Sequence, residues 1–169
     1  MEEAKKKIAY IDAANIILAL KSIDLEVDFL KLKIFLEDKF RLDEVYYFTA
    51  DLEKLKESIL SLRENNFNVI TKSVYFENHK TKANCDVEIS HYITKHVENN
   101  EVSEIILLSG DGDFSMLLDY AKSKNIEVKL MPANKKSTSK ILKTKKFLKI
   151  FFIEELISKF EKEKTPVST

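Results

Sequence analysis

Aspartates follow two predicted strands at the points where these strands end. Asp12 comes directly after the apolar run 8–11, and Asp111 and Asp113 come soon after the run 105–108. If the two strands are neighbours in a parallel sheet, their carboxyl ends bring the three carboxylates to one edge. Unpaired carboxylates about 4 Å apart repel each other by several kcal/mol, so they need a cation or a proton. Oxygen ligands favour Mg²⁺ or Mn²⁺ over zinc, and the pattern therefore predicts a site for one of these ions.

Other roles for the polar residues near these strand ends stay open. Asp111 or Asp113 alone could be the N-cap of the following helix, although two carboxylates at alternate positions exceed what a cap requires. Asn15 could cap the first helix, or its amide could hold a phosphate or a water on the metal. For Ser109 the favoured role is that of a hydroxyl that stabilises a turn. The second role is a contact to a phosphate or to a water on the metal.

Asp86 is a carboxylate on the predicted apolar face of a helix. In the predicted helix 85–97 it lies in line with Ile89, Ile93 and Val97. An ionised group is costly there unless it is paired or bound to a metal. The helix dipole offers a second explanation, because it stabilises a carboxylate near the helix N-terminus. Asp86 is therefore a further candidate metal ligand, and both interpretations remain.

Both glycines of the chain, Gly110 and Gly112, lie beside Asp111 and Asp113. Glycine usually makes up about 7% of a protein. A chain that uses its only glycines at one place is expected to need unusual backbone geometry there.

The composition is that of a folded single domain. The chain has 169 residues, 44% of them hydrophobic and 33% charged, which predicts one domain over residues 1–163 and a frayed tail at 164–169. No apolar run approaches the roughly 18 residues that span a bilayer, and the N-terminus is not typical of a signal peptide. We therefore expect a cytoplasmic protein without membrane contact, and a homodimer is an oligomeric state that the sequence leaves open.

Several other chemistries lack their motifs. Cys85 is the lone cysteine, which excludes an internal disulfide and a cysteine-rich zinc site, and we expect it to be a small buried residue. His91 and His96 are five residues apart, whereas a helical zinc pair needs a spacing of four. The chain has no GxSxG elbow, no GxGxxG fingerprint and no phosphate-binding GxxxxGK loop.

A lysine-rich segment, residues 129–149, contrasts with the zero net charge of the chain. Eight lysines and no carboxylate fall between Val128 and Ile153. The segment is either a solvated face or a surface for a polyanion, and charge alone favours the solvated face.

Predicted strands and helices alternate along most of the chain, and the strands are nearly continuous apolar runs. Such strands are buried on both faces, so the pattern predicts an α/β fold, with a mostly parallel sheet between two layers of helices. The ligand site of such a sheet lies near the point where the strand order reverses. The predicted strands are 8–11, 45–49, 68–76, 104–109, 126–131 and 147–153; the predicted helices include 14–19, 85–97, 137–145 and 154–162, and 77–84 is a predicted loop.

Three motifs occur in order along the chain: Ile11-Asp-Ala-Ala-Asn15, Lys82-Ala-Asn-Cys-Asp-Val87 and Ser109-Gly-Asp-Gly-Asp-Phe114. They resemble the motifs of the NYN domain family, whose members are PIN-like, metal-dependent ribonucleases, and the bacterial LabA-like branch is most similar. The third is fairly specific, and the order and spacing of all three extend the resemblance over residues 8–153. The resemblance implies a PIN-like three-layer α/β/α sandwich with an acidic pocket for Mg²⁺ or Mn²⁺.

Carried onto this sequence, the resemblance implies catalytic and metal-binding roles for four aspartates. They are Asp12, Asp86, Asp111 and Asp113; together with the lysine-rich segment, the resemblance suggests that Asn15, Ser109, Lys82, Lys143, Lys145 and Lys146 bind the substrate. Three positions depart from the family pattern. Tyr92 and Lys145 stand where the family often has acids, and Met116 stands where it commonly has proline.

The expected activity is endonucleolytic hydrolysis of single-stranded or structured RNA. The metal would activate a water that Asp12 or Asp111 orients, leaving 5′-phosphate and 3′-hydroxyl ends. Tyr75, Phe76 and Tyr92 are candidates for stacking on unpaired bases, although core packing is the commoner role of aromatics.

Two alternatives belong to other functional classes. One is a catalytically weak RNA-binding or regulatory module of the same fold. The other is a receiver-type phosphotransfer domain, which ranks last because the strands after the first do not end in an isolated acceptor aspartate.

Overall fold

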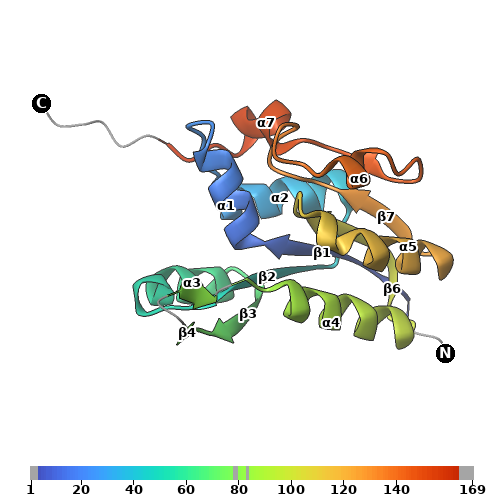
Figure 1. The fold of residues 1–169 in the computed structure, drawn as a ribbon, viewed down its shortest axis with the longest axis horizontal. Coiled ribbons are helices and arrows are strands. Elements are labelled where there is room, and N and C mark those ends of the chain that lie inside the picture. The colour runs from blue at the N-terminus through green and yellow to red at the C-terminus, as the bar shows by residue number, and fades with distance from the viewer. Residues whose placement is uncertain (1–3, 78–79, 83, 164–169) are drawn as a thin grey trace, which may run out of the picture.

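The computed structural model describes residues 4–77, 80–82 and 84–163. Its centre is a six-stranded parallel sheet with helices on both faces (Figure 1). The strands of this sheet are β1 (Lys6–Asp12), β2 (Glu44–Asp51), β3 (Asn68–Ser73), β6 (Val102–Leu108), β7 (Glu127–Leu130) and β8 (Lys149–Ile150). The main helices are α1 (Ala13–Lys21), α2 (Phe29–Phe40), α3 (Lys56–Glu64), α4 (Asp86–Glu98) and α5 (Ser115–Ser123). The predicted three-layer α/β/α sandwich is confirmed.

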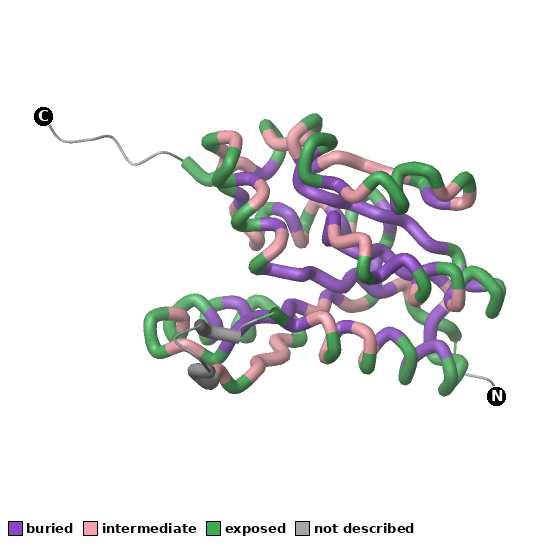
Figure 2. Tube along the Cα trace, in the orientation of Figure 1, coloured by how far each residue is buried: buried purple, intermediate pink, exposed green. Residues whose placement is uncertain are grey.

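The sheet buries both of its faces, which is why its strands are nearly continuous apolar runs. On one face, Leu20 of α1 and Leu36 of α2 belong to the core. On the other face, Ile93 of α4 and Leu118 of α5 do so. Figure 2 shows the buried colour running along the central strands, while the outer surfaces of the helices are exposed.

The strand order is β3-β2-β1-β6-β7-β8, and it reverses between β1 and β6. These two strands pair in parallel, with Ile11 opposite Leu108. The ends of β1 and β6 are therefore neighbours, which is the condition on which the predicted cluster of carboxylates depended, and they flank the crevice in which such sheets bind ligands. A receiver domain has a different order, in which the first strand is second from one edge, so the topology speaks against that alternative.

The predicted strand 68–76 is wrong, because it is two strands of different sheets. β3 ends at Ser73, and β4 (Tyr75–Glu77) pairs antiparallel with β5 (Lys80–Lys82) in a separate two-stranded sheet. The predicted loop 77–84 thus contains a strand. An apolar pattern cannot distinguish these cases, because it carries no information on which strand is the hydrogen-bond partner.

The C-terminal third is less regular than predicted. The helix predicted at 137–145 is a single turn, α6 (Lys140–Lys143), and the strand predicted at 147–153 is only β8. The helix predicted at 154–162 is replaced by the short α7 (Ile153–Leu156) and a 3-10 turn, η3 (Ile157–Lys159). Leu148 and Ile153 are nevertheless buried. The segments around these residues pack on the core although their backbone is mostly irregular. Their buried apolar residues therefore give the same sequence pattern as a regular strand or helix.

The extent of the domain, residues 1–163, stays a prediction, and its predicted tail lies outside the described residues. Among the residues that are described, no helix has the length and apolar character that a membrane span requires.

Asparagines take the left-handed positions that follow α3, α4 and α5, while Asp24 and Arg41 take those that follow α1 and α2. Asn66, Asn100 and Asn125 have φ values of 62°, 60° and 61° and follow α3, α4 and α5. Glycine is the usual residue at such positions, and asparagine is the next best tolerated. The chain can therefore do without glycine at its helix ends.

A buried charge pair joins β6 to β7 near the amino ends of the strands. Lys129 of β7 and Glu104 of β6 are 8% and 4% exposed. The Lys129 Nζ lies 2.8 Å from Glu104 Oε1 and 2.9 Å from Glu127 Oε1. Lys129 thus belongs to the interior, although it is the first residue of the lysine-rich segment.

Replacing Lys129 with alanine should lower the free energy of unfolding by about 3 kcal/mol, because buried Glu104 would keep only the longer contact to Lys7 Nζ, at 3.8 Å. Lys149→Ala is the matched control: Lys149 is exposed and pairs with Glu127, so its loss should cost less than about 1 kcal/mol. Urea denaturation measures both. Equal, small losses would show that the buried pair does not stabilise the fold.

Candidate functional site

Asp12 lies at the junction of β1 and α1, where it makes two hydrogen bonds. It is the last residue of β1 and the N-cap of α1, and its carboxylate accepts a hydrogen bond from the backbone N–H of Asn15 at 3.4 Å. The Ser109 hydroxyl, directly after β6, donates to Asp12 Oδ2 at 3.0 Å. Both Asp12 and Ser109 are buried. These contacts fix the orientation of the Asp12 carboxylate and join the two central strands at their carboxyl ends.

The pKa of Asp12 is raised to about 6, chiefly by burial and to a smaller extent by the nearby charges of Asp86 and Asp111. The hydrogen bonds from Ser109 and Asn15 act in the opposite direction, because they stabilise the ionised form. The buried carboxylate is therefore less acidic than an ordinary aspartate, and a nearby cation would favour its ionised form.

Three further aspartates come together beside it and form the acid triad, Asp86, Asp111 and Asp113. One carboxylate oxygen of each lies within 4.8 Å of those of the others. Burial raises the pKa of Asp86, and the charges of Asp111 and Asp113 raise it further. A set of oxygen donors at this spacing suits a hard divalent cation such as Mg²⁺ or Mn²⁺.

Asp86 is held in place by two residues that the sequence analysis missed. The Asn84 side-chain amide donates to Asp86 Oδ2 at 2.8 Å, and the Lys72 ammonium donates to the backbone carbonyl oxygen of Asn84 at 2.8 Å. Lys72 also lies 3.6 Å from Glu88 Oε1, and its charge lowers the pKa of Asp86. No pattern in the sequence indicates this link, because it depends on how the end of β3 meets the start of α4.

The loop after β6 is fixed by a chain of hydrogen bonds. The Asp111 amide donates to Ser109 Oγ at 3.2 Å, and Asp111 Oδ1 accepts from the Asp113 amide at 2.9 Å. Asp111 is thus the cap of the following turn, while it also belongs to the acid triad. Asn15 Oδ1 accepts from the Gly110 amide at 2.9 Å. Asn15 therefore positions this loop. It does not cap α1, because the cap of that helix is Asp12.

The two glycines are needed for close packing rather than for unusual backbone geometry. Neither has a positive φ, so that expectation was wrong. A Cβ at Gly112 would lie 2.6 Å from Ser139 Oγ, and one at Gly110 would lie 3.3 Å from Thr138 Cα. The Ser139 amide also donates to the Gly110 carbonyl oxygen at 3.0 Å. Glycine suits both positions because residues 137–139 lie directly against the loop, and the space is tightest at Gly112.

The predicted substrate-binding lysines have different surroundings. Lys143 Nζ donates to the Lys135 carbonyl oxygen at 3.1 Å, and Lys145 Nζ lies 2.6 Å from Asp119 Oδ1 on α5. Lys146 is exposed and makes no ion pair with another described residue. The side chain of Lys82 lies outside the described part of the structure.

Tyr92 packs in an aromatic cluster instead of facing the acid triad. Its ring lies 5.5 Å from that of Tyr46 and 5.7 Å from that of Phe48, between ring centroids. The side chains of Tyr75 and Phe76, the other two candidates for base stacking, lie outside the described part of the chain.

Cys85 is the buried residue that the sequence predicted. Burial raises the pKa of its thiol to about 11. The thiol therefore stays protonated at neutral pH and is a poor nucleophile.

The comparisons with known proteins agree with this geometry. The sequence profile of the NYN domain matches residues 7–151. The crystal structure of a protein of unknown function from Vibrio parahaemolyticus has a similar fold, with a TM-score of 0.74 at 21% identity. The alignment covers 96% of this chain and 99% of that chain. A search of curated proteins found no match.

Replacing Asp12 with asparagine should stabilise the metal-free protein at pH 7.5. The pKa of Asp12 is about 6 when folded and about 3.9 when unfolded, so ionisation of Asp12 lowers stability as the pH rises from about 4 to 6. Asp12→Asn removes this cost, which is about 1–3 kcal/mol at pH 7.5 and close to zero at pH 4.

Denaturation in EDTA at both pH values measures this difference. Asp38→Asn on the exposed side of α2 is the control, and it should change stability little at either pH. A wild-type protein that is more stable than Asp12→Asn at pH 7.5 would contradict the interpretation.

Proposed function

Because the chain belongs to the NYN domain family, we propose that it is a metal-dependent ribonuclease that hydrolyses RNA phosphodiester bonds endonucleolytically. The observation that carries this proposal is the acid triad beside Asp12, at the point where the strand order reverses. Four carboxylates beside one another are costly in a structural role alone, because they repel each other without a cation. RNA phosphodiesters are the substrate class that the family implies.

The proposed metal ligands are the acid triad and Asp12. Bound Mg²⁺ or Mn²⁺ would supply an acidic centre that lowers the pKa of a water and stabilises negative charge on the phosphate. Asp12 is proposed to orient the attacking water, with Asp111 as the other candidate. Asp12 is suited to this role because hydrogen bonds from the Ser109 hydroxyl and the backbone N–H of Asn15 fix its carboxylate. Attack by water leaves 5′-phosphate and 3′-hydroxyl ends.

The lysine-rich segment is proposed to hold the RNA backbone. Residues 137–139 lie against the glycine loop that carries Asp111 and Asp113, so the segment and the acid triad are adjacent. Lys143 and Lys146 are exposed there and are proposed to contact phosphates. Lys145 is proposed to contact a phosphate after it releases its ion pair with Asp119. Lys82 is also proposed to contact a phosphate, and this proposal rests on the family resemblance alone.

A second candidate function is an RNA-binding or regulatory module with weak catalysis. Tyr92 and Lys145 stand at positions that are often acidic in the family, and both are engaged elsewhere. Tyr92 packs in the aromatic cluster, and Lys145 pairs with Asp119. Fewer acidic ligands would weaken metal binding and slow hydrolysis.

Purified protein should cleave a long RNA of mixed structure in Mn²⁺ or Mg²⁺ and should leave it intact in EDTA. Asp111→Asn should lower the rate at least about 100-fold, because it removes a metal ligand. Asp38→Asn is the control carboxylate change and should leave the rate unchanged. Sequencing of the fragments should find 5′-phosphate ends. Cleavage that persists in EDTA would refute the metal-dependent mechanism, and tight binding without cleavage would favour the regulatory module.

Changing Lys143, Lys145 and Lys146 together to alanine should weaken RNA binding and flatten its dependence on salt. Each lost phosphate contact should reduce the slope of log K against log salt by about 0.7. Binding measured in EDTA from low to high KCl tests this. The control changes Lys95 and Lys122, which lie on α4 and α5 outside the lysine-rich segment. An unchanged slope would remove the segment from the proposed binding surface.

A further inference from the structure

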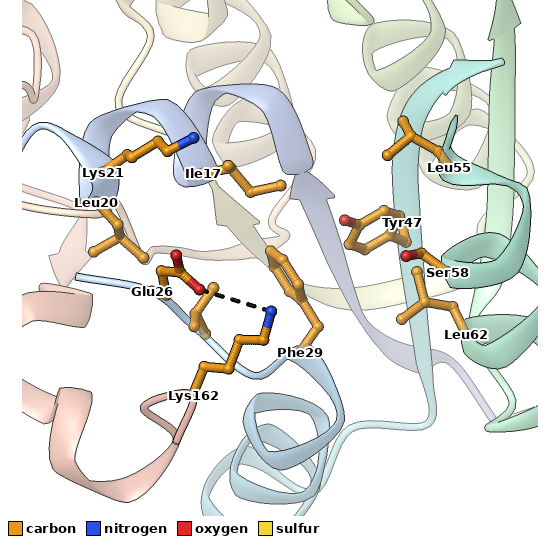
Figure 3. A pocket seen from close by; sticks show the side chains of 11 residues that line it. Ile17, Leu20, Lys21, Glu26, Phe29, Tyr47, Leu55, Ser58, Leu62 and Lys162 are labelled. Carbon is orange, nitrogen blue, oxygen red and sulfur yellow. Dashed lines mark ion pairs between the residues drawn. The ribbon is translucent and has the colours of Figure 1, made fainter. Parts of the chain in front are cut away.

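A pocket separate from the acid triad lies between α1 and α3, with β2 behind it (Figure 3). Its volume is about 280 Å³, close to the lower end of the range for small-molecule sites. Most of its wall is apolar, with Ile17 and Leu20 from α1 facing Leu55 and Leu62 across it (Figure 3). A space of this size suits a single ring system rather than a helix or strand of a partner.

Two hydroxyl groups interrupt the apolar wall. Tyr47 is only 6% exposed, and Figure 3 shows its hydroxyl pointing into the pocket beside that of Ser58. Neither hydroxyl makes a hydrogen bond with another described residue. The ring of Tyr47 is fixed by an edge-to-face contact with Phe29, at 5.0 Å between centroids. The Tyr47 hydroxyl thus faces the open space of the pocket rather than the closed core, where it is available to hydrogen-bond a ligand.

The Tyr47 hydroxyl stays protonated at physiological pH, because burial raises its pKa to about 12. It can therefore both donate and accept a hydrogen bond. The Ser58 hydroxyl has the same capacity. A bound group that suits both must carry polar atoms at its edge, which an aliphatic chain does not.

The mouth of the pocket carries positive charge. Lys21 and Lys162 both line it and are exposed. Lys162 lies 3.7 Å from Glu26 Oε2 (Figure 3), and this exposed pair contributes little and can exchange for a phosphate. The pocket thus combines an apolar interior, two hydroxyls and a cationic rim.

The helix α1 connects this pocket to the candidate active site. Asp12 caps the first turn of α1, and Ile17 lies five residues further along. At a rise of about 1.5 Å per residue, the two are about 8 Å apart along the helix axis. An RNA strand at the acid triad therefore has a neighbouring nucleotide within reach of the pocket.

We propose that this pocket binds one unpaired nucleotide of the RNA substrate, with the base inside and its phosphate on Lys21 and Lys162. The proposal rests on the proposed ribonuclease function and adds that the preferred substrate is single-stranded. The apolar walls contact the faces of the base, and the hydroxyls of Tyr47 and Ser58 bind its polar edge. A base held in a duplex cannot enter, because it is stacked and paired.

The test uses a fluorescent RNA of about 12 nucleotides, a length within the range that single-strand-binding folds cover. Binding is measured in EDTA, for the single strand and for the same strand in a duplex. Tyr47→Phe and Ser58→Ala each remove one hydroxyl and preserve the apolar wall. Tyr46→Phe and Ser61→Ala are the matched controls: Tyr46 packs with the opposite core, and Ser61 is exposed on α3 like Ser58 but does not line the pocket.

The double variant Tyr47→Phe, Ser58→Ala should weaken single-strand binding about tenfold, since each lost hydrogen bond contributes roughly a fewfold factor. Duplex binding and the control variants should not change. In Mn²⁺ the KM of the double variant for single-stranded RNA should rise while kcat stays unchanged, because the pocket contacts a nucleotide beside the cleaved bond. Ultraviolet crosslinking of a thiouridine-containing strand should label a peptide that lines the pocket.

Two results overturn the inference alone: unchanged single-strand binding in the double variant, or equal losses in Tyr46→Phe and Ser61→Ala. A free nucleoside monophosphate that binds the pocket while RNA binding is unaffected also overturns it, because the nucleotide would then not belong to the substrate. Wild-type protein that neither binds nor cleaves RNA overturns this inference together with the proposed function. The wild-type measurement therefore separates the two failures.

Discussion

The register of β1 against β6 determines where the polar groups of the candidate site lie. Because Ile11 pairs with Leu108, both strands leave the sheet at the same level, and Ser109 can donate to Asp12 across the gap. The strand order also reverses here, so the helices that follow the two strands cover opposite faces and a crevice opens between them. A register shift of one residue would turn the side chains of β1 to the wrong faces. The cores on both faces and the site between them therefore depend on one strand pairing.

The sequence predicted those features that depend on apolar periodicity and on strand ends. The apolar runs of β1 and β6 predicted two buried strands, and Asp12, Asp111 and Asp113 follow the carboxyl ends of these strands in the sequence. Features that depend on side-chain contacts between distant segments could not be predicted. Lys72 and Asn84 position Asp86 only because β3 ends beside α4, and no spacing in the chain records that. The strand pattern indicates that Tyr47 is a core residue, and only the structure shows that its hydroxyl faces a pocket.

Opposite charges are brought together by one packing contact. The glycine loop carries Asp111 and Asp113, and it packs without a Cβ at Gly112 against Ser139 of the lysine-rich segment. A larger residue at Gly112 would push the two segments apart. The carboxylates can attract a cation while the neighbouring lysines attract phosphates, and each group lowers the electrostatic cost of the other. The glycines thus maintain the distance between the two kinds of charge.

The central place of the first strand has a consequence for the order in which the molecule is made. Asp12 is synthesised before its neighbour in space, the end of β6, which follows roughly 100 residues later along the chain. At about 5–20 residues per second, a ribosome needs several seconds to make that interval. During this time the nascent chain carries Asp12 without the loop that completes the acid triad. A nascent chain that has not yet released β6 from the ribosome therefore cannot yet bring Asp12 together with Asp111 and Asp113.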